Sequence, residues 1–451
     1  MLVQIKNAQI QNASATRTYT PSDWDPDFRL FETEFGHHLF LVNGSRVYNV
    51  PEELIEELRT AQEQGTKTEI LQAYGLTAAP YIDDEALLDP PLRAISLAIA
   101  QSCNLGCVYC YAQQGSFGGE ARAMSRSAAL GAIDLLLADA GAGERVQVTY
   151  LGGEPLANRE LLRESAEYAT TLAVRKGAEV RFSITTNGTL LTAEDGEFFE
   201  RHGFAVTISL DGHGAMHDRL RPFKDGRGSY DRILSRLQPL LQGQRRMQVS
   251  ARVTVTPENL DLRNTLDTFT GMGFHSVGFS PMLSSPGSAS EMGPADLAEM
   301  LRQMIDCGAE FERRVGQGDR YPFLNMANAM REIHKGTHRP YPCGAGAGYL
   351  GVSADGGLYA CHRFVGDEAG KMGNLSGGID REKRNGWLAE RHVHFQSPCS
   401  ECWARYLCGG GCHHEVLQRG RPACDYIRGW LDYCLHAYIR LLERRPEYFT
   451  S

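Results

Sequence analysis

The sequence predicts an α/β fold in which parallel strands alternate with helices. Short apolar runs recur from about residue 91 to residue 330, and amphipathic stretches separate them. This alternation is typical of βαβ units, whose strands lie parallel in one sheet. Six strands are predicted, over residues 94–100, 146–150, 180–185, 204–210, 248–255 and 275–280. Periodicity alone leaves two architectures open, a doubly wound sheet and an open (β/α)6 barrel.

Two helices between these strands can be placed from local signals. One is predicted to begin near Ser125 and to run through residues 128–137. Another should follow Thr192, because Asp195 stands three positions later in the spacing of a capping box. A basic patch, which we interpret as a solvated loop, is made of Arg219, Arg221, Lys224 and Arg227. The alternative is that this patch steers an acidic peptide to the protein.

Residues 1–90 form the first predicted unit. The polar residues 1–30 have no clear period, so they are a tail or a first strand. Strands over 38–42 and 45–50 are joined by Asn43-Gly44, a strong hairpin signal. Two short helices follow, beginning at Pro51 and at about Thr68. Such a unit has a sheet edge that can accept a peptide strand, and the alternative is a structural cap on the middle unit.

Length and composition indicate a globular protein of more than one domain. The chain has 451 residues, of which 42% are apolar and 22% are charged. A formal net charge of -9 argues against a nucleic-acid partner. No stretch reaches the length of a membrane span, and the first residues lack the pattern of a secretory signal. We therefore expect a cytoplasmic protein that does not bind membranes.

Cysteine is the most informative residue type in the chain. Twelve cysteines without a predicted secretory signal indicate metal ligands rather than disulfides. Cys103, Cys107 and Cys110 have the spacing C-x3-C-x2-C and follow a predicted strand directly. Three thiolates so close together can hold an iron–sulfur cube and leave its fourth iron open. Zinc is the alternative, although structural zinc sites usually have four ligands from paired C-x2-C motifs.

With Tyr109 before its last cysteine, this motif resembles the signature of radical S-adenosylmethionine (SAM) enzymes. The resemblance implies that Cys103, Cys107 and Cys110 bind a 4Fe–4S cluster, whose open iron chelates the amino and carboxylate groups of SAM. It also implies that the reduced cluster cleaves SAM to a 5′-deoxyadenosyl radical. Finally, it favours the open (β/α)6 barrel, in which the loops that follow the strands build the site.

Further motifs follow other predicted strands, in the order that the resemblance requires. Residues 151–155 resemble the GGEP element that receives the amino group of SAM, and residues 185–188 and 209–212 resemble elements that contact its ribose. A guanidinium on the fifth strand suits the SAM carboxylate. The residues implied to bind the cofactor are Tyr109, Gly152, Gly153, Glu154, Thr186, Asn187, Ser209, Asp211 and Arg252. For Asp211, capping the turn that follows is an equal alternative.

The third predicted domain, residues 331–451, follows the barrel domain at 91–330 and is dense in cysteine. Its seven-cysteine series resembles the SPASM domain, which carries auxiliary clusters in peptide-modifying radical enzymes; two zinc knuckles are the alternative. The resemblance implies two more 4Fe–4S clusters, three in all. The implied ligands are Cys399, Cys402, Cys408 and Cys424 for an outer cluster and Cys343, Cys361 and Cys412 for an inner one.

Two assignments in this domain stay open. Cys434 could replace Cys424 or complete the inner cluster, but it lies in an apolar helical repeat, so we favour Cys424. The fourth inner ligand is not identified, and an open iron there could bind a substrate thiolate. We interpret Cys307, in an amphipathic stretch, as a small buried apolar residue.

The resemblance spans nearly the whole chain and suggests a subgroup. Residues 102–115 and 420–429 resemble the maturase of quinohemoprotein amine dehydrogenase and, less closely, other thioether-forming maturases. The implied reaction joins a cysteine sulfur to a carbon, such as an Asp or Glu methylene, in a small cysteine-rich peptide or protein. The implied partners are that substrate and an electron donor such as flavodoxin or ferredoxin. The N-terminal unit would be a winged-helix-like peptide-recognition element.

Two other functions stay open at this point. The first is a different modification by the same architecture, such as a carbon–carbon crosslink or a formylglycine. The second is a zinc-binding interaction protein without catalytic activity.

Overall fold

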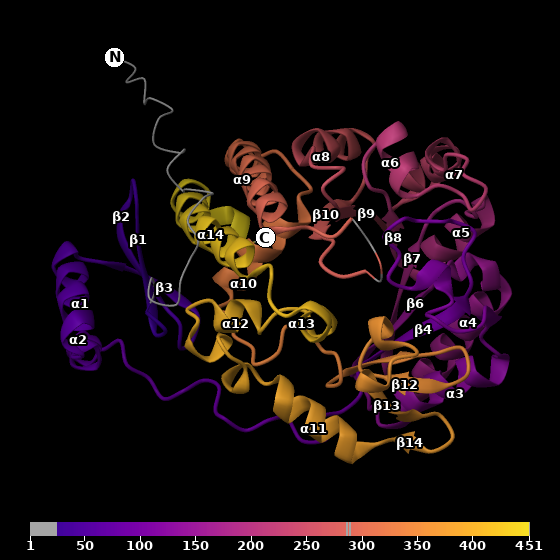
Figure 1. Cartoon of the computed structure of the whole chain (residues 1–451), viewed down its shortest axis with the longest axis horizontal. Coiled ribbons are helices and arrows are strands. Elements are labelled where there is room, and N and C mark those ends of the chain that lie inside the picture. Colours follow the sequence, from indigo (N-terminus) through magenta and orange to yellow (C-terminus); the bar gives the residue numbers. More distant parts are fainter. Residues whose placement is uncertain (1–24, 286, 288–289, 451) are drawn as a thin grey trace.

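The computed structural model describes residues 25–285, 287 and 290–450, and it divides into the three parts shown in Figure 1. The N-terminal unit and the strands of the barrel lie on opposite sides, and much of the C-terminal part lies between them. Most of the polar segment that the sequence leaves as a tail or a first strand, residues 1–24, lies outside the described residues. Within the described residues, no helix has the length and apolar character that crossing a membrane requires.

The N-terminal unit is a three-stranded antiparallel sheet with two helices. Its strands are β1 (Phe28–Thr33), β2 (Gly36–Leu41) and β3 (Arg46–Val50), in that order, and the helices are α1 (Glu52–Gln64) and α2 (Lys67–Ala73). The predicted hairpin and both predicted helices are present. The unit has a small core of its own, made of Phe28, Leu39, Leu41, Leu54, Leu58 and Leu71. This separate core explains why the sequence pattern of the unit could be recognised without its neighbours.

The middle part is the predicted α/β partial barrel. Its six strands pair in parallel, and all six predicted strands are present: β4 (Ala94–Gln101), β6 (Arg145–Gly152), β7 (Glu179–Thr186), β8 (Ala205–Ser209), β9 (Gln248–Val255) and β10 (Ser276–Pro281). The helices between them are α3 (Arg126–Ala138), α4 (Arg159–Lys176), α5 (Ala193–His202), α6 (Ala215–Leu220), α7 (Tyr230–Gly243) and α8 (Leu262–Gly271). Ser125 caps α3, and Thr192 and Asp195 form the predicted capping box of α5.

The C-terminal part continues the sheet of the barrel. β11 (Tyr349–Val352) pairs in parallel with β4, and the antiparallel strands β12 (Gly357–Tyr359), β13 (Lys371–Asn374) and β14 (Gly378–Ile379) extend the sheet from there. A two-residue strand, β5 (Arg122–Ala123), pairs with the end of β4. The barrel and the cysteine-rich region therefore share backbone hydrogen bonds, which the sequence pattern did not predict.

Helices complete the C-terminal part. α9 (Pro294–Gly316), α10 (Leu324–His334) and α14 (Cys424–Arg444) pack together, and α11 (Arg381–Arg391), α12 (Arg405–Cys408) and α13 (His413–Arg419) carry the cysteine-rich segment. The N-terminal unit contacts α14, where Arg29 Nε lies 2.9 Å from an Asp432 carboxylate oxygen. The connector after α2 bonds to the same part, because Asp84 lies 2.7 Å from His394 Nδ1. The N-terminal unit is thus anchored on the cysteine-rich region.

Candidate active site at the strand ends

The first three cysteines lie on the loop that leaves the carboxyl end of β4. The Leu105 amide donates to Cys103 Sγ at 3.4 Å, which holds the start of the loop. Burial, and then the neighbouring thiols of Cys110 and Cys103, raise the pKa of Cys107 to about 12. Thiols with such a pKa are poor free nucleophiles, but a bound metal takes up the thiolate charge and removes the proton. The three sulfurs therefore suit a metal cluster better than covalent catalysis.

The Gly152-Gly153-Glu154 run binds the chain beside the first of these cysteines. The amides of Gly153 and Glu154 donate to the carbonyls of Ala100 and Ser102 at 2.8 and 2.9 Å. A Cβ atom on Gly153 would lie 2.2 Å from the Ser102 oxygen, so only glycine allows this approach. The glycines therefore bring the end of β6 against the cysteine loop, whereas the sequence interpretation assigned them to a ligand.

The Glu154 carboxylate is also used by the chain itself. It is fully buried and accepts hydrogen bonds from the Thr186 hydroxyl at 2.7 Å and the Asn187 amide at 2.8 Å. It also accepts one from the Leu156 amide at 3.0 Å. Asn187 in turn donates its side-chain amide to Cys103 Sγ at 3.6 Å. Glu154, Thr186 and Asn187 thus connect β6 and β7 to the first cysteine.

A buried network of charged and aromatic side chains lies beside the same loop. The Tyr109 hydroxyl donates to Asp211, and Arg221 Nη1 donates to the Tyr109 hydroxyl at 2.6 Å. Arg221 and Asp211 also form an ion pair with a nitrogen–oxygen distance of 3.6 Å. Burial raises the pKa of Asp211, and the Arg221 guanidinium opposes this shift. The same guanidinium favours the thiolate form of Cys107.

Arg221 corrects the sequence interpretation, which placed it in a solvated patch. Its residue is only 9% exposed, and its Nε has no hydrogen-bond partner among the described residues. The backbone beside it runs along the cysteine loop, because the Val108 amide donates to the Leu220 carbonyl at 3.1 Å. Position could have identified this residue: it follows Asp211 in the connection between β8 and β9, directly after α6, and the connections after strands build the site in such sheets.

His217 supports Asp211 from the far side. The Asp211 amide donates to His217 Nδ1 at 3.2 Å, and His217 Nε2 lies 3.1 Å from the Ser229 hydroxyl. Ser229 Oγ donates its own hydrogen to the Arg221 carbonyl at 2.6 Å, so it accepts from Nε2–H. Burial lowers the pKa of His217 to about 3. A neutral imidazole therefore positions the Asp211 backbone.

Arg252 lies at some remove from this network. It projects from β9 on the side opposite the buried Ala251 and Val253, and it donates to the Ser280 hydroxyl on β10. Desolvation by nearby protein groups lowers its pKa, and the opposing interactions come from Glu415 and Tyr426 of the C-terminal part. Arg252 therefore faces the cysteine-rich region, while Arg221 is the guanidinium near Cys107. Ser209, at the end of β8, is half-buried.

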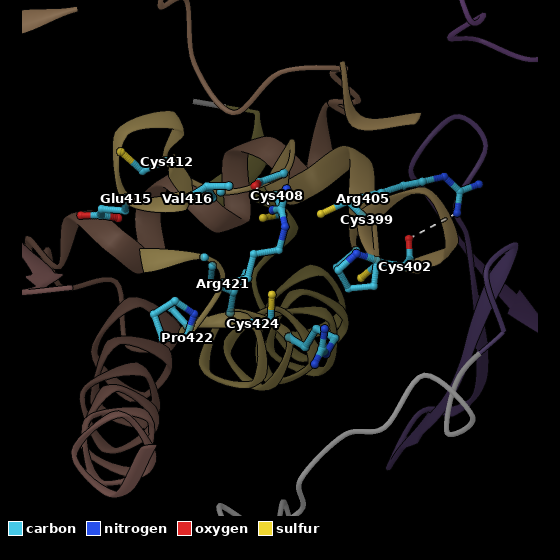
Figure 2. Close-up of a pocket in the computed structure, with 18 of the residues that line it drawn as sticks. Cys399, Cys402, Arg405, Cys408, Cys412, Glu415, Val416, Arg421, Pro422 and Cys424 are labelled. Carbon is cyan, nitrogen blue, oxygen red and sulfur yellow. Dashed lines mark hydrogen bonds between the residues drawn. The ribbon is translucent and has the colours of Figure 1, made fainter. Parts of the chain in front are cut away.

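The cysteines of the C-terminal part separate into two sets. Burial, and then the thiols of Cys412 and Cys343, raise the pKa of Cys361 to about 12. Burial likewise raises the pKa of Cys399 to about 12, and there the interacting thiols belong to the other set. That set consists of Cys399, Cys402, Cys408 and Cys424, and it lines one apolar pocket that Cys412 also borders. Its sulfurs gather round the Arg421 side chain in Figure 2, whereas Cys412 points away beside Glu415.

A tight backbone turn separates the two sets. Gly409, Gly410 and Gly411 all have left-handed φ angles, of 72°, 98° and 80°. Residues other than glycine rarely adopt such backbone angles. The three glycines can therefore turn the chain sharply between Cys408 and Cys412. The assignment of these two neighbouring cysteines to different clusters stays a prediction.

The two remaining cysteines are buried in the helical core. Cys307 on α9 and Cys434 on α14 are both 0% exposed and belong to the main apolar cluster. All twelve cysteines lie in the described part of the chain and all are free. Ten of them therefore form sets of three, three and four, and the donors of each set are sulfur alone. In the described ranges, no three His, Cys, Asp or Glu side chains converge as ligands of a single metal ion.

Comparison with known proteins identifies the middle part. The model of the radical SAM superfamily matches residues 97–269. A serine-type anaerobic sulfatase-maturating enzyme of Klebsiella aerogenes is 26% identical over 360 residues, which cover 76% of this chain and 85% of that enzyme. The matched domain carries the first cysteine loop and every strand-end motif described above up to Arg252.

Two solved structures share the fold. Native anSMEcpe with bound AdoMet and Kp18Cys peptide has a TM-score of 0.65 and 18% identity, over 78% of this chain and 99% of that one. Streptococcus suis SuiB bound to the precursor peptide SuiA has a TM-score of 0.52 and 15% identity, over 88% of this chain and 97% of that one. The predicted partial barrel is thereby confirmed.

A radical SAM domain implies a 4Fe–4S cluster and SAM, and the thiol set at the end of β4 suits that cluster. The alternative of a zinc-binding interaction protein without catalytic activity is therefore wrong. The sulfatase-maturating relative and the SuiB fold agree with the predicted SPASM type of enzyme. Residues 97–269 are a radical SAM domain, and the chain is an enzyme that carries this domain.

Proposed function

We propose that this enzyme is a SPASM-type maturase that forms thioether bonds in a cysteine-containing peptide or small protein. One observation carries the proposal: the inner set has three thiols, those of Cys343, Cys361 and Cys412. Cys307 and Cys434, which belong to no set, are buried in the helical core. A cube held by three protein thiols keeps one iron for a ligand from outside. A substrate cysteine is a natural ligand for that iron.

Three 4Fe–4S clusters would account for the ten grouped cysteines. The first would take Cys103, Cys107 and Cys110, the inner one the three thiols named above, and the outer one Cys399, Cys402, Cys408 and Cys424. Cys424 is preferred to Cys434 because it lines the pocket of the outer set. The first cluster and SAM would supply the radical, with an electron from a donor such as flavodoxin or ferredoxin.

SAM would lie over the strand ends beside the first cluster. The residues around it would be Tyr109, Gly152, Gly153, Glu154, Thr186, Asn187, Ser209 and Asp211. We assign its carboxylate to Arg221 instead of Arg252, because Arg221 lies near Cys107 and has an Nε without a partner in the described structure. The GGEP residues and Asn187 would act by holding the cysteine loop in place.

The proposed reaction balances in atoms and electrons. A carbon–hydrogen bond and a sulfur–hydrogen bond of the peptide break, and one carbon–sulfur bond forms. The carbon-bound hydrogen leaves in 5′-deoxyadenosine, the thiol proton is released, and SAM becomes methionine. The electron that starts the cleavage is returned when the carbon–sulfur bond closes, so a cluster near the substrate must accept it. Asp or Glu methylene carbons are the proposed acceptors.

The N-terminal unit would recognise the substrate peptide. β3 is an edge strand, because it pairs with β2 alone in the three-stranded sheet. Unpaired backbone groups on such an edge can bind an extended peptide as a further strand. The solved SuiB structure contains its precursor peptide, which supports a peptide substrate here as well.

Formylglycine formation is the second candidate. The similarity to a serine-type sulfatase-maturating enzyme favours it, since that relative matches 76% of this chain. Oxidation of a serine to formylglycine removes two hydrogens, as thioether formation does. The two products differ in that only formylglycine carries a reactive carbonyl and only the thioether consumes a thiol.

Mass spectrometry under anaerobic conditions tests the proposal. Reconstituted enzyme, SAM and dithionite are incubated with synthetic cysteine-containing peptides from short reading frames beside the gene, and with a sulfatase-type serine peptide. We expect a cysteine peptide to lose two hydrogens for each bond and to resist thiol alkylation. A hydrazine-reactive product from the serine peptide, with every cysteine peptide unchanged, would establish the second candidate instead.

A further inference from the structure

Arg252 is the starting point, because it is a guanidinium that the chain does not neutralise. Its residue is exposed, yet protein groups lie close enough to desolvate it and lower its pKa. Its hydrogen bond goes to a neutral hydroxyl, that of Ser280. Across the described residues, no carboxylate lies within ion-pair distance of it. A cation in such a place gains most from a carboxylate that arrives with a ligand.

The acidic group that interacts with Arg252 is already paired with another arginine. Glu415 interacts with Arg252, but its carboxylate lies 2.7 Å from Arg363 Nη1. The Arg363 guanidinium carbon lies 5.1 Å from the centre of the Tyr111 ring. Tyr111 directly follows Cys110 in the sequence. Two guanidinium groups therefore share one carboxylate, and the surplus positive charge lies at Arg252.

This surplus charge lies beside the inner thiol set. Glu415 stands in the first turn of α13, whose N-cap is Cys412. Arg363 adjoins a second thiol of the set, Cys361, in the sequence. A ligand bound at Arg252 would therefore have its other groups near the inner set.

The Arg252 guanidinium lies beside a glycine of the neighbouring strand. Gly278 on β10 is the register partner of Arg252 on β9, and a Cβ atom there would lie 3.6 Å from Arg252 Nη1. The same Cβ atom would lie 3.2 Å from Leu324, so the glycine lets both side chains approach β10 closely. The forked donor face of arginine matches a carboxylate in geometry as well as in charge.

We propose that Arg252 binds the carboxylate of an acidic side chain in the substrate peptide, and so selects the Asp or Glu whose carbon is modified. The inference rests on the proposed function, since it assumes a peptide with a cysteine at the inner set. It deepens that function by naming the residue that recognises the Asp or Glu to be modified. It also separates the two arginines: Arg221 serves the cofactor, and Arg252 serves the substrate.

Peptide selection tests this assignment. Immobilised, anaerobically reconstituted full-length enzyme with SAM is offered a displayed library in which one cysteine is fixed and the other positions are random. For the wild type we expect enrichment of Asp or Glu at a set distance from the cysteine. For Arg252→Met that enrichment should fall by about 10- to 100-fold, the range of a lost hydrogen bond to a charged group. Arg252→Lys keeps the charge but loses the two-pronged donor geometry of the guanidinium, so its acidic enrichment should lie between those of the wild type and Arg252→Met.

Two further measurements make the test specific. The SAM dissociation constant of Arg252→Met should stay within about twofold of wild type, because an untouched contact leaves the binding free energy unchanged. Arg302→Met is the matched control: this arginine is exposed on α9 and pairs with Glu299 and Asp306, so selection should be as in the wild type. Iron content and circular dichroism confirm that each variant folds.

The outcomes separate the inference from the proposed function. Acidic enrichment that survives in Arg252→Met overturns the inference and leaves the maturase function intact. Weaker SAM binding with unchanged peptide selection also overturns it, and would return Arg252 to the cofactor. If the wild type retains no cysteine peptide above background, both the inference and the proposed function fail.

Discussion

The two cysteine-bearing regions of the molecule hold their thiols in different ways. The first loop is held from neighbouring strand ends, through Glu154, Asn187 and the close backbone contact at Gly153. In the C-terminal part, the stretch from Cys408 to Cys412 is held by the short helices α12 and α13 and by the left-handed run from Gly409 to Gly411. The comparison teaches that the first site depends on the sheet as a whole, whereas this later stretch depends on local turns.

Removing a cysteine from the first region should have the largest effect. Cys107→Ala leaves two thiols for the first cluster, so we expect SAM cleavage to fall by about three orders of magnitude or more. Chromatography of 5′-deoxyadenosine measures this, and iron analysis should show loss of roughly one cluster in three. Cleavage near the wild-type rate would show that these thiols do not hold the catalytic cluster.

Removing a cysteine from the C-terminal region should separate two activities. In Cys361→Ala the first cluster is untouched, so SAM should still be cleaved without peptide modification. Peptide mass and 5′-deoxyadenosine, measured in the same reaction, give the ratio of product to cleaved cofactor. We expect that ratio to fall by about a hundredfold or more, since the group that would activate the substrate thiol is lost. A normal ratio would contradict the role of the inner set.

Two glycine substitutions compare the regions directly. In Gly153→Ala the new methyl meets the Ser102 carbonyl at 2.2 Å, so the cysteine loop must move. We expect a loss of about 2–3 kcal/mol in unfolding free energy, together with the first cluster. Gly411→Ala meets Val416 at 3.5 Å and is strained only by its φ of 80°, so about 1 kcal/mol should be lost. Denaturant unfolding and iron content of both variants are the measurements; equal effects would remove the distinction between the regions.

The smallest effect concerns pH. Folding lowers the pKa of His217 from 6.5 to about 3. Between about pH 3 and pH 6.5, His217 is therefore protonated in the unfolded chain and neutral in the folded one. Its contribution to stability is therefore complete above pH 6.5 and is lost as the pH falls. Replacing it with Gln removes that proton, and the slope of unfolding free energy near pH 5 should decrease by about 1.4 kcal/mol per pH unit. Unfolding series at several pH values measure the slope; an unchanged slope would contradict the neutral, buried imidazole.

Sequence reasoning succeeded where a local pattern decides the structure. All six barrel strands, the capping box at Thr192 and Asp195, and the hairpin at Asn43-Gly44 are present. Cysteine spacing also predicted two C-terminal sets, and the division of the thiols between them stays a prediction. Each of these features depends on neighbours within a few residues or on one repeated chemical type.

Its errors concern side chains whose partners are distant in the chain. Arg221 was interpreted as solvated, because burial by the cysteine loop more than 100 residues earlier leaves no local trace. For Glu154, which is assigned to a ligand, the sequence also could not show the bonds to Thr186 and Asn187 at the end of the next strand. A charged residue in a loop reads as exposed unless the tertiary contact that satisfies it is known.

The pairing of β11 with β4 has a consequence for how such enzymes can change. A chain ended near residue 330 would leave one edge of β4 with open amide and carbonyl groups over the stretch Ala94–Leu97. Exposed edges of this kind recruit strands from other chains and promote aggregation. The cysteine-rich region could therefore not be lost or exchanged as an independent appendage without a replacement strand to cover that edge.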